Sequence, residues 1–168
     1  MLIDNFIFIA RNYKSKYSNI FNIDHENKTV ASNCGGLFKY LLNKDGITLP
    51  ERACEIYDFF KQSQHLKILD IRKVQRGDII LWKKKVIPLS GDSGHLSIID
   101  DVIQIKTESA LVRVYDSVKN IHQNDSRENS GLGHGEIELL LNGVVPCGFR
   151  WLGDNKKTKF TDILIVRI

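Results

Sequence analysis

The chain has 168 residues, 42% of them hydrophobic, and this length and composition predict one globular domain over residues 1–168 with a sizeable core. Its 24 basic and 20 acidic residues are spread along the chain and leave a formal net charge of +4. Two small lysine clusters, at residues 83–85 and 156–159, are interpreted as solvated turns because neither is interleaved with aromatic residues. The charge pattern therefore argues against a nucleic-acid partner.

The N-terminal stretch MLIDNFIFIA has no basic leading segment and only a five-residue apolar run. Such a run is too short for a signal peptide or a membrane span. We therefore expect no membrane association, and a chain that is cytoplasmic or is exported by a signal-independent route.

The first helix is expected at residues 4–17, where apolar side chains recur at near-helical spacing behind Asp4, a good capping residue. Residues 18–31 are polar and predict a loop. The chain thus begins with one amphipathic helix followed by an irregular connection.

Two more helices are expected before the pattern changes. Ser32 or Asn33 can cap a second helix that ends at the turn of residues 43–46. Thr48 opens a third helix that runs to about Gln64.

After Gly77 the pattern changes to alternation and short apolar runs, which predict about six strands. Asn142-Gly143 between two such runs is a strong hairpin signal. The polar segment 117–133 is longer than a usual connection, and either a flexible surface loop or a substrate-facing loop would fit it. Helices first and strands afterwards predict an α+β fold, with the N-terminal helices packed on one face of a mainly antiparallel sheet. The six strands are expected at residues 78–82, 96–102, 110–115, 137–141, 144–151 and 163–168.

The three cysteines, Cys34, Cys54 and Cys147, are an odd number without the close pairing of a zinc site. We therefore expect neither a disulfide framework nor a bound metal, and a reducing compartment is the simpler interpretation. Cys54 and Cys147 lie in apolar segments and are predicted to be buried and unbonded.

Cys34 differs, because it lies in the stretch SNCGG directly before the apolar run of the second helix. A thiol in the first turn of a helix is exposed to unpaired N–H groups and to the positive end of the helix dipole, which favour the thiolate. Gly35 and Gly36 are poor helix formers, which is understandable if a ligand approaches the backbone beside the sulfur. A buried structural cysteine on the apolar stripe is the alternative.

His95, in the stretch SGHLSII, stands at the first position of an apolar strand. At that edge an imidazole can lie opposite a helix start and exchange a proton with a thiol. The other four histidines lie in polar or loop-like contexts and are interpreted as solvated surface groups: His25, His65, His122 and His134.

Asp116 is the predicted partner of His95. If the strands at 96–102 and 110–115 form a hairpin turning near residues 105 and 106, His95 lies directly opposite Asp116. The carboxylate would then fix the tautomer of the imidazole and stabilise its charged form. Alternatively, Asp116 only starts a turn with Ser117.

Cysteine before a helix, then the stretches RGDIILW, GHLSIIDDV and YDS, resemble the papain-fold cysteine amidases and peptidases of the NlpC and CHAP type over most of residues 32–116. The tail GLGHGEIELL and NGVVPCGFRW also resembles the C-terminal strands of uncharacterised bacterial members. The resemblance implies a papain-like fold and hydrolysis of an amide bond, often in bacterial cell-wall peptides. No cofactor is implied.

We therefore predict a thiol-dependent amidohydrolase or peptidase in which Cys34 is the nucleophile, His95 the general base and Asp116 the orienting acid. Asn33 and Ser93, which precede the nucleophile and the base, are the predicted substrate-binding residues. Members that cleave cell-wall peptides often have aspartate where this chain has Asn33, and they are usually exported.

We expect the Cys34 backbone N–H to donate a hydrogen bond to the oxyanion, and Tyr13 or Tyr17 is the candidate for a second donor. Two other functions stay open. One is a catalytically silent binding module with the same fold. The other is a protein-directed deamidase or ubiquitin-type peptidase.

Overall fold

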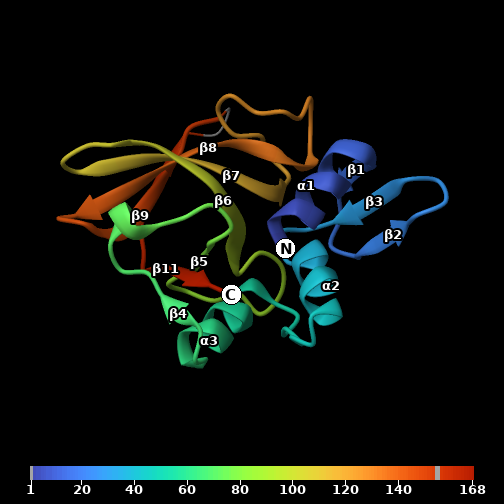
Figure 1. Cartoon of the computed structure of the whole chain (residues 1–168), viewed down its shortest axis with the longest axis horizontal. Coiled ribbons are helices and arrows are strands. Elements are labelled where there is room, and N and C mark those ends of the chain that lie inside the picture. Colours follow the sequence, from blue (N-terminus) through green and yellow to red (C-terminus); the bar gives the residue numbers. More distant parts are fainter. Residues whose placement is uncertain (1, 154–155) are drawn as a thin grey trace.

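The computed structural model describes residues 2–153 and 156–168 and shows an α+β fold with helices packed on a curled, antiparallel sheet (Figure 1). The predicted single domain over residues 1–168 includes residues 1 and 154–155, which lie outside the described residues. Among the described residues, no helix combines the length and the apolar character needed to cross a lipid bilayer.

The first helix is shorter than expected. Helix α1 (Leu2–Asn12) buries Ile3, Phe6 and Ile9, as its spacing predicted. The prediction that it continues to residue 17 is wrong, because the alternating stretch Lys14–Tyr17 pairs as strand β1 with residues further along the chain.

The stretch expected to be a loop forms the rest of a small three-stranded sheet with the order β1-β3-β2. Strand β2 (Asn22–Asp24) runs antiparallel to β3 (Thr29–Ser32), and β1 runs parallel to β3. The loop prediction is therefore wrong for residues 22–24 and 29–31 and holds for 18–21 and 25–28, since Val30 and Ala31 are buried and pairing satisfies the backbone of β3.

Helices α2 (Gly36–Lys44) and α3 (Ala53–Gln62) follow. Helix α3 begins later than the expected Thr48, because the Glu55 carboxylate accepts a hydrogen bond from the Arg52 N–H and caps the helix there.

The main sheet has eight strands, and every neighbouring pair is antiparallel. All six expected strands are present, and the Asn142-Gly143 hairpin joins two of them. The expected count of six is too low, because two short strands at the sheet edges carry little apolar periodicity. These are β4 (Leu66–Lys67) and β10 (Lys157–Phe160). In spatial order the sheet is β10, β9 (Val145–Trp151), β8 (Gly131–Asn142), β7 (Ser109–Val118), β6 (Gly94–Ile105), β5 (Ile79–Lys83), β11 (Ile163–Arg167) and β4.

Both faces of the sheet bury apolar side chains. One face packs against the helices and contributes Leu81, Leu96 and Ile98 to a core that includes Phe6, Phe38 and Phe60. The other face curls on itself and encloses a second core, whose members include Ile80, Trp82, Ile99, Val112, Val114, Ile137 and Phe149. This curling brings β5 and β9 together, although three strands separate them in the sheet order.

Candidate active site

Cys34 lies in the turn between β3 and α2, two residues before the helix begins. The expectation that Cys34 lies within the first helical turn is therefore wrong, because Gly35 is the N-cap of the helix and Cys34 precedes it. The Asn33 side-chain oxygen accepts hydrogen bonds from the N–H groups of Gly35 and Gly36, at 3.0 and 2.9 Å. This capping orders the turn that carries the thiol and commits the amide oxygen of Asn33 to the backbone.

Gly36 has a packing explanation rather than a ligand-related one. A Cβ atom at this position would lie 2.7 Å from the Ser32 hydroxyl oxygen and 2.9 Å from the ring of Phe21. The glycine therefore lets the helix start approach β3 closely. The interpretation that both glycines leave room for a ligand beside the sulfur is not needed for Gly36.

His95 and Asp116 are in contact, as expected from the strand pattern. The His95 Nε2 atom lies 2.7 Å from Asp116 Oδ2. The expected register is wrong, because the hairpin turns between Lys106 and Ser109 rather than near residues 105 and 106. Two bulges in the β6–β7 ladder shift the pairing back only in part, so Ile98 lies opposite Tyr115 and Ser97 lies across from Asp116. His95 reaches the carboxylate from the diagonal position on the same face.

Aromatic rings hold the imidazole of His95 in place. Its ring centroid lies 5.1 Å from that of Trp82 and 5.6 Å from that of Trp151. Gly94 lets the start of β6 approach β5 closely, because a Cβ atom at residue 94 would lie only 2.2 Å from the Trp82 carbonyl oxygen. The His95 side chain is 12% exposed, so it has an open side toward solvent.

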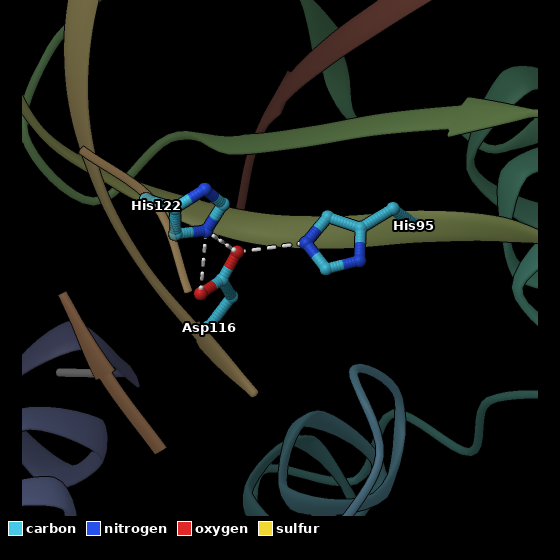
Figure 2. A group of neighbouring side chains, drawn as sticks. All are labelled: His95, Asp116 and His122. Carbon is cyan, nitrogen blue, oxygen red and sulfur yellow. Dashed lines mark hydrogen bonds and ion pairs between the residues drawn. The ribbon is translucent and has the colours of Figure 1, made fainter. Parts of the chain in front are cut away.

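Asp116 is fully buried, and its carboxylate receives hydrogen bonds on both oxygens (Figure 2). Besides His95, Oδ2 accepts from the Ser97 hydroxyl at 3.0 Å and contacts His122 Nε2 at 2.9 Å. Oδ1 accepts from Arg127 Nη1 at 2.9 Å. A carboxylate held from several sides has one orientation, and it fixes the orientation of His95 in turn.

The segment between β7 and β8, residues 119–130, supplies two of these contacts. Its His122 and Arg127 side chains fold back onto Asp116, and Asp125 holds Arg127 through two hydrogen bonds of 2.6 and 2.8 Å. His122 is 3% exposed and packs on Trp151 with a centroid distance of 4.1 Å. The prediction that His122 is a solvated surface group is therefore wrong.

Sequence reasoning missed Arg127 and misjudged His122, because no periodicity specifies how an irregular segment folds. The available signal was the composition of this long connection, where histidine, aspartate and arginine occur within a few residues of one another. The contacts of His122 and Arg127 with Asp116 argue against a flexible surface loop, and a substrate contact of the segment stays a prediction.

The environment of His95 favours its charged form. Burial alone lowers the pKa of the imidazole, but the hydrogen bond and the negative charge of Asp116, together with the nearby Cys34, raise the pKa to about 10. Cys34 and His95 line the same cleft. The site therefore favours an imidazolium at His95.

Asp116 is ionised for a related reason. Burial alone raises the pKa of this carboxyl, but the charges of His122 and Arg127 and the hydrogen bonds from His122 and His95 hold it well below its usual range. Asp116 therefore carries the negative charge that the imidazolium of His95 requires.

His95, Asp116 and His122 also place three metal-type donor atoms within 4.8 Å of one another. The ring nitrogens of His95 and His122 are already hydrogen-bonded to the carboxylate of Asp116, and the guanidinium of Arg127 contacts the same carboxylate. A cation here would have to displace these hydrogen bonds and lie beside a fixed positive charge. The donor set fits a hydrogen-bonded network better than a metal site.

The remaining predicted residues have clear positions. Ser93 is buried, and its hydroxyl accepts a hydrogen bond from the Cys54 N–H at 3.2 Å, so a substrate contact for it stays a prediction. Tyr17 lines the cleft, where burial first and then the charges of Cys34 and Asp92 raise the pKa of its hydroxyl. Tyr13 instead bonds His25 at 2.8 Å.

The cysteines are unbonded, as predicted. Cys54 is buried, whereas Cys147 is half-buried on the peripheral strand β9, so the prediction of burial holds for Cys54 only. Of the other histidines, His25 is exposed, while His65 and His134 are half-buried.

No protein-family model matches the chain, and no curated protein matches it. A solved structure from Staphylococcus aureus, described as similar to lipoprotein of the NLP/P60 family, aligns with 18% identity and a TM-score of 0.44 over 80% of this chain and 36% of that one. Mycobacterium tuberculosis RipD, described as a non-catalytic NlpC/p60 domain protein adapted to peptidoglycan binding, aligns with 13% identity and a TM-score of 0.34 over 80% of this chain and 96% of that one. Likenesses this distant do not assign the chain to a family.

Proposed function

We propose that the chain is a thiol-dependent amidohydrolase or peptidase with a papain-like, NlpC-type fold. Cys34 is the nucleophile, His95 the general acid and base, and Asp116 the group that orients His95. The observation that carries the proposal is the 2.7 Å contact between His95 Nε2 and a fully buried, multiply bonded Asp116 carboxylate, in a cleft that Cys34 also lines.

The reaction follows from these positions. The Cys34 thiolate attacks the carbonyl carbon of an amide, and the carbonyl oxygen becomes an oxyanion. The Cys34 backbone N–H is one donor for it, and the Tyr17 hydroxyl, which lines the same cleft, is the second. His95 gives its proton to the leaving nitrogen, the C–N bond breaks, and an amine and a thioester on Cys34 result.

Water then completes the cycle. Neutral His95 takes a proton from a water molecule as the water oxygen attacks the thioester carbon. The C–S bond breaks, the acid product leaves, and the thiolate and imidazolium are restored. Asp116 stays ionised throughout, because its role is to orient and stabilise the imidazolium.

The substrate belongs to the same proposal. A peptide amide is the class that this chemistry attacks, and an amide of a bacterial cell-wall peptide is the first candidate from the sequence resemblance. Side-chain amides of proteins and ubiquitin-type linkages are the alternative. These classes give different products, since peptide cleavage releases two fragments and deamidation releases ammonia.

The proposal is tested by incubating the wild-type protein with peptidoglycan fragments and with protein substrates, followed by mass spectrometry of the products. Cys34→Ser should reduce turnover by at least about a thousandfold, because the alcohol is not activated as a thiolate is. Cys147→Ser is the matched control, since Cys147 is also half-buried but does not line the cleft, and it should keep wild-type turnover. Full activity of Cys34→Ser would remove the nucleophile role. A wild-type protein without product in every assay would favour the silent binding module.

A further inference from the structure

The proposed active site lies in a cleft of about 950 Å³, and two lysine clusters that are far apart in the sequence meet there. Residues 83–85 follow Trp82 at the end of β5, and residues 156–159 lead into and through β10. Lys119, directly after β7, is a further lining residue. The interpretation of the clusters as solvated turns is wrong for residues 157–159, which belong to β10, and for Lys83, which belongs to β5, because both segments pair in the main sheet.

The lysines of β10 are placed by strand register. Lys157 pairs with Trp151 and Lys159 pairs with Phe149 across the β9–β10 ladder. Directly paired residues project to the same side of a sheet. The side chains of Lys157 and Lys159 therefore project from the face of the sheet that bears Trp151, whose ring contacts His95.

The charges that line the cleft are strongly unbalanced. Seven of the lining residues are lysines, whereas Asp92 is the one carboxylate among the described lining residues. Asp92 pairs with Lys84, and Asp58 pairs with Lys83. Within residues 2–153 and 156–168, Lys157 and Lys159 form no ion pair with a carboxylate. A concave surface with one sign of charge attracts ligands of the opposite sign.

Of the five phenylalanine, tyrosine and tryptophan residues among the described lining residues, only Phe160 is exposed, at 64%, so the cleft does not offer successive rings for stacking nucleic-acid bases. Trp82 and Phe149 stack on each other with centroids 4.3 Å apart, and both are buried. Trp151 has one face against His122 at 4.1 Å. Recognition of a single strand requires free aromatic faces, so carboxylates fit the cleft better than bases do.

We propose that this cleft selects a peptide that carries carboxylate side chains near the amide presented to Cys34, with Lys157 and Lys159 as specificity-determining residues. The amide and its cleavage depend on the proposed function, but the charge selection is a property of binding and does not require turnover. The lysines that line the cleft attract the carboxylates of the peptide, and the rings of Trp82 and Trp151 hold His95 in place in the same cleft.

Binding is tested with the Cys34→Ala protein, which cannot turn over the ligand. The probe is a fluorescent peptide with two glutamates on each side of a central alanine pair, and its counterpart has glutamine at the same positions. Fluorescence anisotropy at low salt should show roughly tenfold tighter binding of the glutamate peptide, and the preference should shrink at high salt. A labelled oligothymidine is measured in parallel.

Reversing the charge of two lysines tests whether they cause the preference for the glutamate peptide. The double variant Lys157→Glu, Lys159→Glu should lose the preference. The control is Lys73→Glu, Lys106→Glu, which changes net charge equally at exposed positions outside the cleft and should keep it. Equal binding of the two peptides, an equal effect of both double variants, or tighter binding of oligothymidine than of the glutamate peptide would each overturn the inference.

Turnover separates this inference from the proposed function. If the wild-type protein cleaves the glutamine peptide as fast as the glutamate peptide, the charge selection fails and the amidohydrolase stands. If the glutamate peptide binds selectively but the wild-type protein cleaves no amide in any assay, the charge selection stands and the amidohydrolase fails.

Discussion

At Asp116 a fully buried carboxylate contacts His95, His122 and Arg127 through its two oxygens. Burying a carboxylate is costly unless its oxygens are paired, and here the pairing also positions the imidazole of His95 in the cleft that Cys34 lines. The stability of the fold and the charge state of His95 therefore depend on the same side chain.

Asp116→Asn keeps the shape of the side chain but removes the charge that favours the imidazolium of His95. We expect turnover to fall by about a hundredfold or more. The alkaline limb of the pH–rate profile, placed near the His95 pKa of about 10, should move to lower pH. Asp101→Asn, an exposed change on the neighbouring strand β6, is the control and should leave the rate and the profile unchanged. A variant Asp116→Asn with the wild-type profile would remove the orienting role.

The raised pKa of His95 also predicts how stability depends on pH. The pKa rises from 6.5 to about 10 on folding, so the stabilisation from the imidazolium is complete below pH 6.5 and is lost as the pH rises toward 10. Denaturant unfolding at pH 6 and pH 9.5 should show the wild type losing free energy of unfolding over this interval. His95→Gln should lose clearly less. Equal losses in the two proteins would mean that His95 is not charged in the fold.

The sequence allowed His95 and Asp116 to be predicted as partners because alternation places them on one face of a hairpin. It did not allow the register to be predicted, since neither the turn between Lys106 and Ser109 nor the bulges between residues 99 and 104 leave a signal in the apolar pattern. The contact exists despite this error, because the imidazole is long enough to reach a diagonal neighbour.

Among the elements, the segment 119–130 has the largest effect on the site. Arg127 is its anchor: the guanidinium bonds Asp116, Asp125 and the Gly131 carbonyl oxygen, and its side chain is 4% exposed. The backbone of the segment is irregular, but ion pairs and hydrogen bonds hold it in place. These contacts bring His122 and Arg127 against Asp116, one of the proposed active-site residues.

Arg127→Met should destabilise the protein by about 3–5 kcal/mol, because it removes the buried guanidinium that pairs with the carboxylates of Asp116 and Asp125. In the double variant Asp116→Asn, Arg127→Met the cost should be less than the sum of the single changes. Arg150→Met removes a surface pair with Glu138 and should cost at most about 1 kcal/mol. Denaturant melts of the four variants measure these values, and strictly additive costs would contradict the coupling.

The start of α2 gives a second prediction at this scale. Asn33→Ala removes the acceptor for the N–H groups of Gly35 and Gly36 and should cost about 1 kcal/mol of unfolding free energy. Asn33→Asp keeps the acceptor and should stay close to the wild type. If the two variants were equally destabilised in denaturant melts, the capping role of Asn33 would be wrong.

The elements differ in how well the sequence predicts them. The long strands of the main sheet alternate clearly or form apolar runs, and all six were predicted. Strands β1 and β3 were not predicted, because each has only four residues. The two strands pair in parallel, and β2 lies between them in the sequence. Such short strands depend on tertiary pairing rather than on local pattern.

For the whole molecule, the curl of the main sheet is the decisive feature. It brings β5 and β9 together around Trp82 and Phe149, and it gathers both lysine clusters at the cleft that contains Cys34 and His95. Pairings between strands so far apart in the sequence cannot be read from local periodicity. The sequence therefore allowed the contact between His95 and Asp116 to be predicted, but not the charged surface around it.

The pH dependence of thiol alkylation tests the central claim, that Cys34 is held as a thiolate by His95, most directly. Iodoacetamide labelling, followed residue by residue with mass spectrometry, should modify Cys34 at pH 6 at least about a hundredfold faster than the half-buried Cys147. In His95→Gln this advantage should disappear at pH 6, because no imidazolium remains to stabilise the thiolate. Slow and equal labelling of Cys34 and Cys147 in the wild type, or labelling of Cys34 that is unchanged in His95→Gln, would contradict the account.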